Sequence, residues 1–182
     1  MDEMIDIRWR NLTSSLKWLH HFNGGSNSQT TLFYSSYEND NGVDFLGLNL
    51  WYKGHIRQGS LRQDFHIALG RYDLKTGFQS SILNVKSAEW QVLSKYENER
   101  PRAWENAVWL NTNAKVARWL TASAGLRLST FSPLGGSLYY DIAPDGTIDW
   151  YYNYKKNQIV RTHVVWEPRA SLNFSLSPSL NL

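Results

Sequence analysis

Between Trp119 and Phe131, apolar and polar side chains alternate with a period of two. Because successive side chains of a β-strand point to opposite faces, this alternation predicts a strand with one apolar face and one polar face. The edge of a soluble sheet has this pattern, and so does the wall of a transmembrane barrel, with lipid on one side and water on the other. The apolar parity holds Leu120, Ala122, Ala124, Leu126 and Leu128, and the polar parity holds Thr121, Ser123, Gly125, Arg127 and Ser129.

Similar alternation, or enrichment in Thr, Tyr and Phe, predicts further strands along the chain. Turn residues separate them, such as the run from Asn23 to Asn27 and the Pro144–Gly146 segment. No segment with the period of a helix interrupts the series. The predicted strands are Trp9–Phe22, Gln29–Tyr37, Ser60–Leu69, Lys75–Val85, Arg102–Asn113, Trp119–Phe131 and Thr162–Leu176.

The connections between these strands alternate regularly between short and long. The long ones begin at Glu38, Lys86 and Ser132, and the last of them runs to Arg161. A transmembrane barrel has short turns at one end and long loops at the other, whereas a sandwich, whose connections cross between sheets, has no reason to alternate in this way. Two interpretations stay open for Val43–Tyr52, as part of the first long loop or as an extension of the neighbouring hairpin.

We therefore predict an all-β chain, an antiparallel up-and-down meander of about seven long strands. Most of these strands have the ~9–11 residues that cross a bilayer when tilted, so the meander is expected to be part of a transmembrane β-barrel, or an open curved sheet if alone. One alternative is a soluble all-β module that binds carbohydrate. Another is a small complete eight-stranded barrel, although the chain stops at Leu182, where an eighth strand would begin.

The composition narrows these alternatives only in part. Apolar residues make up 42% of the chain, which has 9 Trp and 10 Tyr, and the mean hydropathy is -0.48. The net charge of +3 comes from scattered Lys and Arg, so no nucleic-acid-binding surface is indicated, and the lack of Cys excludes disulfides and thiolate metal sites. The acidic start, Met1–Asp6, has no apolar region typical of a signal peptide, so the chain taken at face value is cytoplasmic.

A series of short motifs, in order, resembles the barrel strands of TonB-dependent outer-membrane receptors, the large transporters with an internal plug. The resemblance covers about Trp9 to Leu182, and each motif alone is a weak pattern. The motifs are Trp9-Arg10-Asn11-Leu12, Leu16-Lys17-Trp18-Leu19-His20, Thr31-Leu32-Phe33-Tyr34-Ser35, Leu61-Arg62-Gln63-Asp64-Phe65, Gly77-Phe78-Gln79, Glu105-Asn106-Ala107-Val108, Gly125-Leu126-Arg127-Leu128-Ser129 and Trp166-Glu167-Pro168-Arg169.

The resemblance implies that residues 1–182 are one piece of a receptor barrel, without the family's export signal, plug or TonB-contacting segment. Such a barrel has about 22 strands, and this piece also lacks the aromatic C-terminal residue usual in the family. The implied partners are outer-membrane lipid, the missing plug, the remaining strands, and TonB through the plug region. The implied location is the outer membrane. The parent would import a large or scarce solute of the siderophore, glycan or peptide class, and this piece alone would not transport.

Polar residues on the strands are expected to face the barrel lumen. Asp64 and His66 share a face and are candidates for pairing, and Glu167 and Arg169 are expected to form an ion pair with cross-strand partners. Pro168 lies on the apolar parity and cannot donate a ladder hydrogen bond, so a local bulge is predicted there. The predicted lumen-facing polar residues are Arg62, Asp64, His66, Arg127, Glu167 and Arg169.

No catalytic or metal-binding pattern is found in the sequence. It has no Gly-x-Ser-x-Gly, no His-Glu-x-x-His and no supported carboxylate pair, so neither an enzyme nor a cofactor is expected. The connection from Ser132 to Arg161 is the candidate substrate-binding region, because aromatic loops stack on sugars or flat chelates. The simpler interpretation is that its rings pack on one another and on neighbouring loops. The aromatic candidates are Tyr139, Tyr140, Trp150, Tyr151 and Tyr152.

Aromatic residues at strand ends are the other candidates for a membrane role. Trp119 and Phe131 lie on the polar parity, so we expect them to cap the lumenal face at its two rims. Trp166 and Phe174 lie on the apolar parity of the last long strand and are the better candidates for the aromatic girdles of a barrel.

Overall fold

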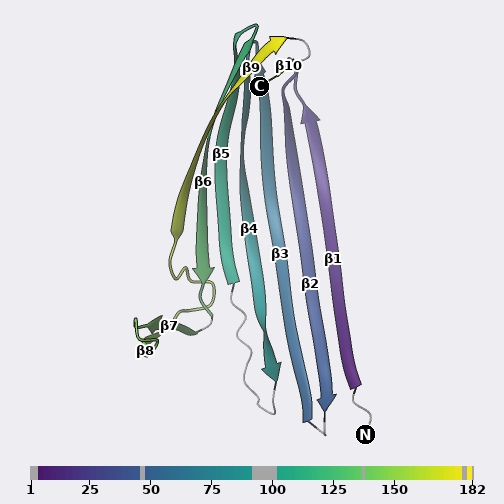
Figure 1. Ribbon diagram of the computed structural model, residues 1–182, viewed down its shortest axis with the longest axis vertical. Helices are drawn as coiled ribbons and strands as arrows, with labels where there is room; N and C mark the ends of the chain where they lie inside the picture. Colours follow the sequence, from purple (N-terminus) through teal and green to yellow (C-terminus); the bar gives the residue numbers. More distant parts are fainter. Residues whose placement is uncertain (1–3, 46–47, 92–101, 137, 178–179, 182) are drawn as a thin grey trace.

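The protein is an antiparallel all-β meander, as predicted (Figure 1). The computed structural model describes residues 4–45, 48–91, 102–136, 138–177 and 180–181. Its main sheet has eight strands in sequential order apart from a two-stranded hairpin, β7 Leu138–Ile142 and β8 Ile148–Asn153, which forms a separate sheet. The strands of the main sheet are β1 Met4–His21, β2 Asn27–Phe45, β3 Leu48–Leu69, β4 Tyr72–Gln91, β5 Arg102–Ala117, β6 Leu120–Leu134, β9 His163–Ser177 and β10 Leu180–Asn181.

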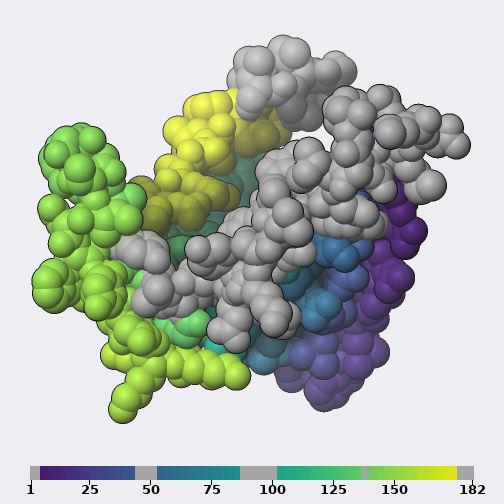
Figure 2. All heavy atoms as spheres, turned by 90° about the horizontal axis from the view of Figure 1, so that it is seen from below, coloured from purple at the N-terminus to yellow at the C-terminus, as the bar shows by residue number. Residues whose placement is uncertain are grey.

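The main sheet is open. Among the described residues, β1 pairs only with β2, and the two-residue β10 pairs only with β9, so the sheet does not close into a barrel. Seven of its strands are long, from 15 residues in β6 and β9 to 22 in β3. Seen from the end of the strands near the β7–β8 hairpin, the sheet is a curved wall from β1 round to β9, with the hairpin standing at its side (Figure 2).

The β2–β3 hairpin is longer than the strand boundaries predicted from the sequence. Its register runs without a break to the pair Phe45–Leu48, so the segment beginning at Glu38 is strand and not a long loop. Ion pairs across the hairpin compensate for its polar sequence, with Glu38 on Arg57 at 2.6 Å and Asp40 on Lys53 at 3.1 Å. The connection beginning at Lys86 also starts as strand, since β4 continues to Gln91, and its remainder lies outside the described residues.

Short turns join the strands at the end of the sheet opposite to the tip of the β2–β3 hairpin. Gly24 and Gly25 lie between β1 and β2 with φ of 83° and 82°, and Gly70 lies between β3 and β4 with φ of 62°. These left-handed conformations favour glycine, so the turn signals in the sequence correspond to the actual chain reversals.

One face of the sheet carries an apolar band. Cross-strand pairs place Leu110 beside Leu126, and Leu128 beside Trp166, on this face. These side chains are exposed, 51% for Leu110 and 62% for Trp166, and only Ala107 and Leu134 are buried hydrophobic residues among the described side chains. The band forms no core of its own, because nothing in the described part of the chain packs against it.

The other face is concave and polar. One hollow of about 780 Å³ on this face is lined by side chains from β3, β4, β5, β6 and β9, so the sheet curves around it. Its lining includes His66, Asn113, Ser123 and Ser171. The alternation predicted from the sequence therefore separates an apolar outer face from a polar concave face.

Pro168 does not produce the predicted bulge. It pairs with Leu126 in an uninterrupted β6–β9 register. Within the described residues, β9 is paired on one side only at this position, because β10 pairs with Ser175 and Ser177, so the strand accommodates a residue without an N–H. No helix in the described residues is long and apolar enough to cross a membrane.

Candidate functional site on the concave face

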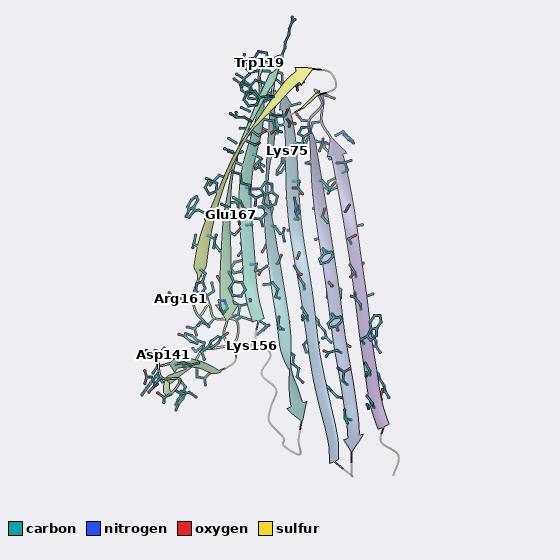
Figure 3. All side chains as sticks on the ribbon, viewed as in Figure 1. Lys75, Trp119, Asp141, Lys156, Arg161 and Glu167 are labelled. Carbon is teal, nitrogen blue, oxygen red and sulfur yellow. The ribbon has the colours of Figure 1, made fainter. Side chains whose placement is uncertain are left out.

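A row of paired residues crosses five strands near the middle of the concave face. Asp64 on β3 pairs with Gly77 on β4, which pairs with Trp109 on β5, and the row continues through Arg127 on β6 to Glu167 on β9. Cross-strand partners share a face, so this row brings distant parts of the sequence together. Figure 3 shows Glu167 well away from both Trp119 at one end and Lys156 at the other.

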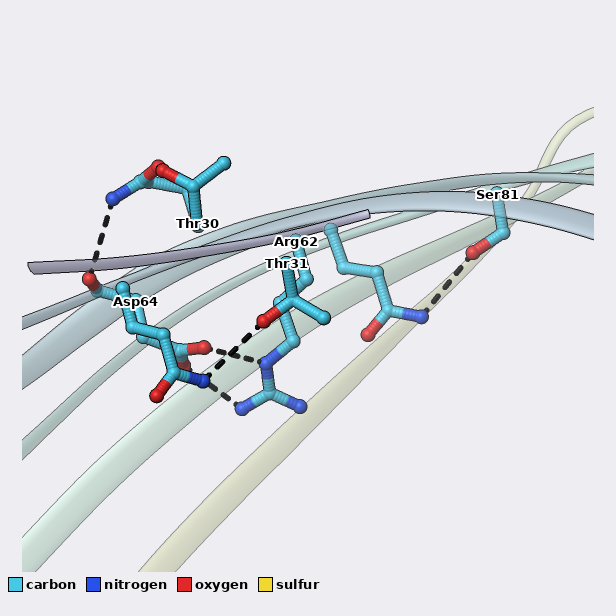
Figure 4. Close-up of polar contacts among 8 residues, drawn as sticks. Thr30, Thr31, Arg62, Asp64 and Ser81 are labelled. Atoms are coloured by element: carbon cyan, nitrogen blue, oxygen red, sulfur yellow. Dashed lines mark hydrogen bonds and ion pairs between the residues drawn. The ribbon is translucent and has the colours of Figure 1, made fainter. Parts of the chain in front are cut away.

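Two guanidinium groups lie over the ring of Trp109. The Cζ atom of Arg62 is 4.8 Å from the ring centroid and that of Arg127 is 5.4 Å from it, both within cation–π range. Asp64 holds Arg62 in place by accepting hydrogen bonds from Nε at 2.7 Å and Nη2 at 2.8 Å (Figure 4). We call Arg62, Asp64, Trp109, Arg127, Glu167 and Arg169 the arginine–tryptophan cluster.

Glu167 joins the other two arginines of the cluster. Its Oε2 accepts a hydrogen bond from Nη2 of Arg169 at 2.9 Å, and its Oε1 lies 3.8 Å from Nε of Arg127 on β6. The hydroxyl of Ser129 donates to Oε1 at 3.3 Å. The predicted cross-strand ion pair of Glu167 is thus confirmed, with Arg127 as the partner, whereas Arg169 pairs within its own strand.

Two glycines leave space for side chains of neighbouring strands that lie flat on the concave face, one for Trp109 of the cluster and one for Asn111 beside it. A Cβ atom at Gly77 would overlap the carbonyl oxygen of Gln63 and lie 2.6 Å from Cζ2 of Trp109, so the indole occupies the space that a side chain would take. A Cβ at Gly125 would likewise overlap the side-chain oxygen of Asn111. Both positions need glycine because of this close approach.

The cluster borders a hollow of about 160 Å³ on the concave face, which Asn111 also lines. Arg127 is about one-third exposed and Glu167 is similar, while Arg169 is mostly exposed. The site is therefore a shallow, solvent-accessible depression with charged walls and an aromatic floor. Charged and amide groups of this kind bind polar ligands. Among the described residues, no group of three or more His, Asp or Glu side chains lies close enough together to hold a metal ion.

His66 does not pair with Asp64, contrary to the interpretation of the sequence. Its Nε2 lies 2.5 Å from Oδ1 of Asp73 on the adjacent strand β4, and its Nδ1 is 3.3 Å from the amide nitrogen of Asn27 on β2. Asp64 is instead engaged by Arg62, which lies two residues away on the same strand and face. Cross-strand partners, which the sequence does not reveal, decide this pairing.

The predicted aromatic loop forms the β7–β8 hairpin, whose five candidates do not share one face. Tyr139 and Tyr152 pair across the hairpin, and both pack on Tyr154, with ring centroids 5.7 and 6.2 Å from it. Trp150 and Tyr151 stack on each other at 6.3 Å. Tyr140 pairs with Tyr151 in register, and its side chain lies outside the described ones. The packing interpretation of these rings is confirmed for Tyr139 and Tyr152.

Trp119 does not cap the concave face. Its ring stacks on Phe174, with centroids 6.0 Å apart and an angle of 18° between the ring planes. Trp119 belongs to the β5–β6 turn and not to β6, which begins at Leu120, so the alternation of the strand does not extend to it. A register shift between Lys115 and Ala117 adjoins this turn.

Sequence reasoning missed Trp109, Gly77 and Tyr154. One signal was present for Trp109, because it shares its parity with Glu105, Asn111 and Asn113 and is the large aromatic ring of an otherwise polar face. Tyr154 continues the alternation of Trp150 and Tyr152 by one step. Nothing in the sequence marks Gly77, since its role depends on the ring of another strand.

The fold and this site define an open, curved all-β sheet with an apolar outer face and a charged concave face. Compared with protein-family models, curated proteins and solved structures, the chain matches none of them.

Proposed function

We propose that the chain is part of the wall of a transmembrane β-barrel, in an outer-membrane receptor of the TonB-dependent type. The exposed apolar band on the outer face carries this proposal. Its outward-facing runs have the ~9–11 residues with which a tilted strand crosses a bilayer. Examples are Leu61–Leu69 on β3, Tyr72–Ile82 on β4, Trp104–Ala114 on β5 and Leu120–Leu128 on β6.

The exposed area of the chain supports the same proposal. The accessible surface is 13897 Å², whereas a compact monomer of the same mass, 21.1 kDa, exposes about 9,000 Å². The open sheet leaves both of its faces exposed, and on the outer face side chains such as Leu16, Trp18 and Leu172 are all more than half exposed. Contiguous apolar surface of this extent requires a cover, and lipid covers a whole face at once.

Polar groups end the band toward the β2–β3 tip. Beyond Leu12 on the outer face, the next residues on β1 and the neighbouring strands are Arg10, Glu38 and His55, and Arg57 pairs with Glu38 there. Charged side chains are costly in the hydrocarbon region and are favourable at its boundary. Strands that continue past the band in this way are expected of a wall that projects from the membrane.

The two faces and edges of the sheet fit a wall that other strands complete. The concave face would line the wet lumen, where charged groups such as Arg62 and Glu167 are tolerated. Among the described residues, the outer edge of β1 and the part of the β9 edge that β10 does not cover expose backbone donors and acceptors that neighbouring strands of a barrel would satisfy. The receptor type comes from the ordered motif resemblance alone, and the solute class, siderophore, glycan or peptide, follows from that resemblance.

The genomic sequence on either side of this coding region tests the receptor type. The proposal expects a plug-coding sequence upstream and further strand-coding sequence downstream. If neither is present, the receptor assignment fails. Purification tests the wall itself: the chain should aggregate without detergent and disperse in micelles. A monodisperse, cooperatively melting monomer in plain buffer would contradict the wall assignment.

A carbohydrate-binding module is the second candidate, and the pair Trp150–Tyr151 favours it. Both rings are 64% exposed although they stack on each other with planes 15° apart, so aromatic surface remains open for stacking on a sugar. A titration of the chain with soluble oligosaccharides tests this function. Saturable binding that is lost in Trp150→Ala would support it, whereas equal signals from both proteins would exclude this platform.

A further inference from the structure

We propose that the arginine–tryptophan cluster binds a small solute through an oxyanion group, a carboxylate or a phosphate. The proposal goes beyond the wall function, because it rests on the cluster geometry and holds whether or not lipid covers the outer face. It concerns the hollow of about 160 Å³ bordered by Arg62, Trp109, Arg127 and Arg169.

The charges of the cluster favour an anion. Three arginines face two carboxylates, Asp64 and Glu167, and two of the arginines share Glu167, so the cluster carries a net charge of +1. Lys75 lies one row away on the same face, next to Asn111, and adds a second cation. Glu105 borders the adjacent hollow, which Arg127 also lines, and is the acidic group on the other side. Asp73, two rows away on the side opposite to Glu105, is in contact with His66, so the positive excess that favours an anion is that of the cluster itself.

Unused hydrogen-bond donors point to the same conclusion. Both contacts of Arg127 to polar groups, at 3.1 Å to Ser129 and 3.8 Å to Glu167, use Nε. Within the described residues its two terminal nitrogens have no hydrogen-bonding partner. Two such nitrogens on one planar guanidinium form the fork that binds carboxylate or phosphate oxygens in pairs.

The cluster is also held in place before any ligand arrives. Asp64 fixes Arg62 through two hydrogen bonds, Ser129 fixes Arg127 through Nε, and the Trp109 ring lies beneath both guanidinium groups. Binding to arginines that are already ordered loses less side-chain entropy than binding to free ones. The floor made by Gly77 and Trp109 leaves the hollow open to solutes the size of a phosphate.

The competing interpretation is a self-contained ion-pair network that only stiffens the wall. The two interpretations differ in the part of Arg127 that matters. A stiffening network depends on the contacts of its Nε atom, whereas an anion site depends on its two terminal nitrogens. Arg127→Lys keeps the positive charge but removes the fork, and Arg127→Gln removes both. Arg10→Gln is the matched control, since Arg10 lies on the outer face, remote from the cluster.

The test measures binding of inorganic phosphate and of citrate to the full chain in zwitterionic micelles, by ¹⁵N NMR of the arginine side chains. We expect saturable shifts of the Arg62 and Arg127 signals, at least about tenfold weaker affinity in Arg127→Gln, an intermediate affinity in Arg127→Lys, and no change in Arg10→Gln. Unchanged affinity in Arg127→Gln would overturn the proposal, as would equal loss in Arg10→Gln or absence of saturation. If Arg127→Gln loses its β-sheet signal by circular dichroism, Trp109→Phe, which retains a ring, replaces it as the test variant. An affinity of Trp109→Phe equal to that of the parent chain would then count against the site.

Discussion

Leu110→Arg places a charge in the middle of the apolar band and is the sharpest test of what covers the outer face. Leu110 lies on β5, between Thr76 and Leu126 on the neighbouring strands. If lipid covers this face, the guanidinium enters the hydrocarbon region. If water covers it, the substitution replaces an exposed leucine with an exposed arginine and costs almost nothing.

The expected free-energy cost of Leu110→Arg follows from the exposure of Leu110 and from its depth in the bilayer. Leu110 is 51% exposed, so lipid would take up about half of its surface, worth about 1 kcal/mol. An arginine at the bilayer midplane on a barrel wall costs about 2–4 kcal/mol. Together these terms give about 3–5 kcal/mol, which weakens partitioning into membranes by about a hundredfold to a few thousandfold.

Flotation of the chain with phospholipid vesicles measures this partitioning. Asn113→Arg is the control, because Asn113 lies on the same strand but on the polar concave face, where a charge meets water. We expect Leu110→Arg to leave the floating fraction while Asn113→Arg stays with the vesicles. Equal partitioning of the two variants would refute the assignment of the apolar band to lipid.

Two further predictions concern the packing of the concave face and the ion pair near the β2–β3 tip. Gly77→Ala forces a Cβ against Trp109 and should lower the free energy of unfolding in micelles by about 1–3 kcal/mol. Gly59→Ala is the control, because its Cβ meets nothing within 4 Å and should leave the stability unchanged. Equal effects of the two substitutions in denaturant titrations would contradict the close packing of Trp109 on Gly77. The hydrogen bond from Arg57 lowers the pKa of Glu38 below its ordinary value of 4.5, so this pair stabilises the hairpin above that pH and is lost as the pH falls through the lowered pKa. ¹³C NMR titration should show the Glu38 midpoint rising in Arg57→Gln, and an unchanged midpoint would contradict this cause.

The main sheet could be predicted because it depends on local alternation. The meander and its two faces follow from parity, and glycine marked two of the turns. The predicted strand ends were too short where Asn39, Asp40 and Asn41 suggested a loop, because cross-strand ion pairs at the tip stabilise a sequence with poor strand propensity. Strand extension of this kind depends on the partner strand and cannot be read from one strand alone.

The site was predictable only in part, for a similar reason. Parity correctly placed Arg62, Asp64, Arg127 and Glu167 on one face, and it favoured an ion pair for Glu167. It could not supply the register that decides which residues meet. Register brings Arg127 beside Glu167 and lays Trp109 over Gly77, and it places Asp73 diagonally across from His66, whose direct partner is Lys75.

The direction of the edge strands has a consequence for assembly. Six antiparallel pairings join the seven long strands, so β1 and β9 run the same way. Two copies of the chain in the same membrane orientation would therefore bring β9 of one against β1 of the other in parallel, a pairing foreign to antiparallel barrels. An all-antiparallel ring containing this sheet needs an odd number of strands beyond the seven, and β10, antiparallel to β9, has the direction of the first of them.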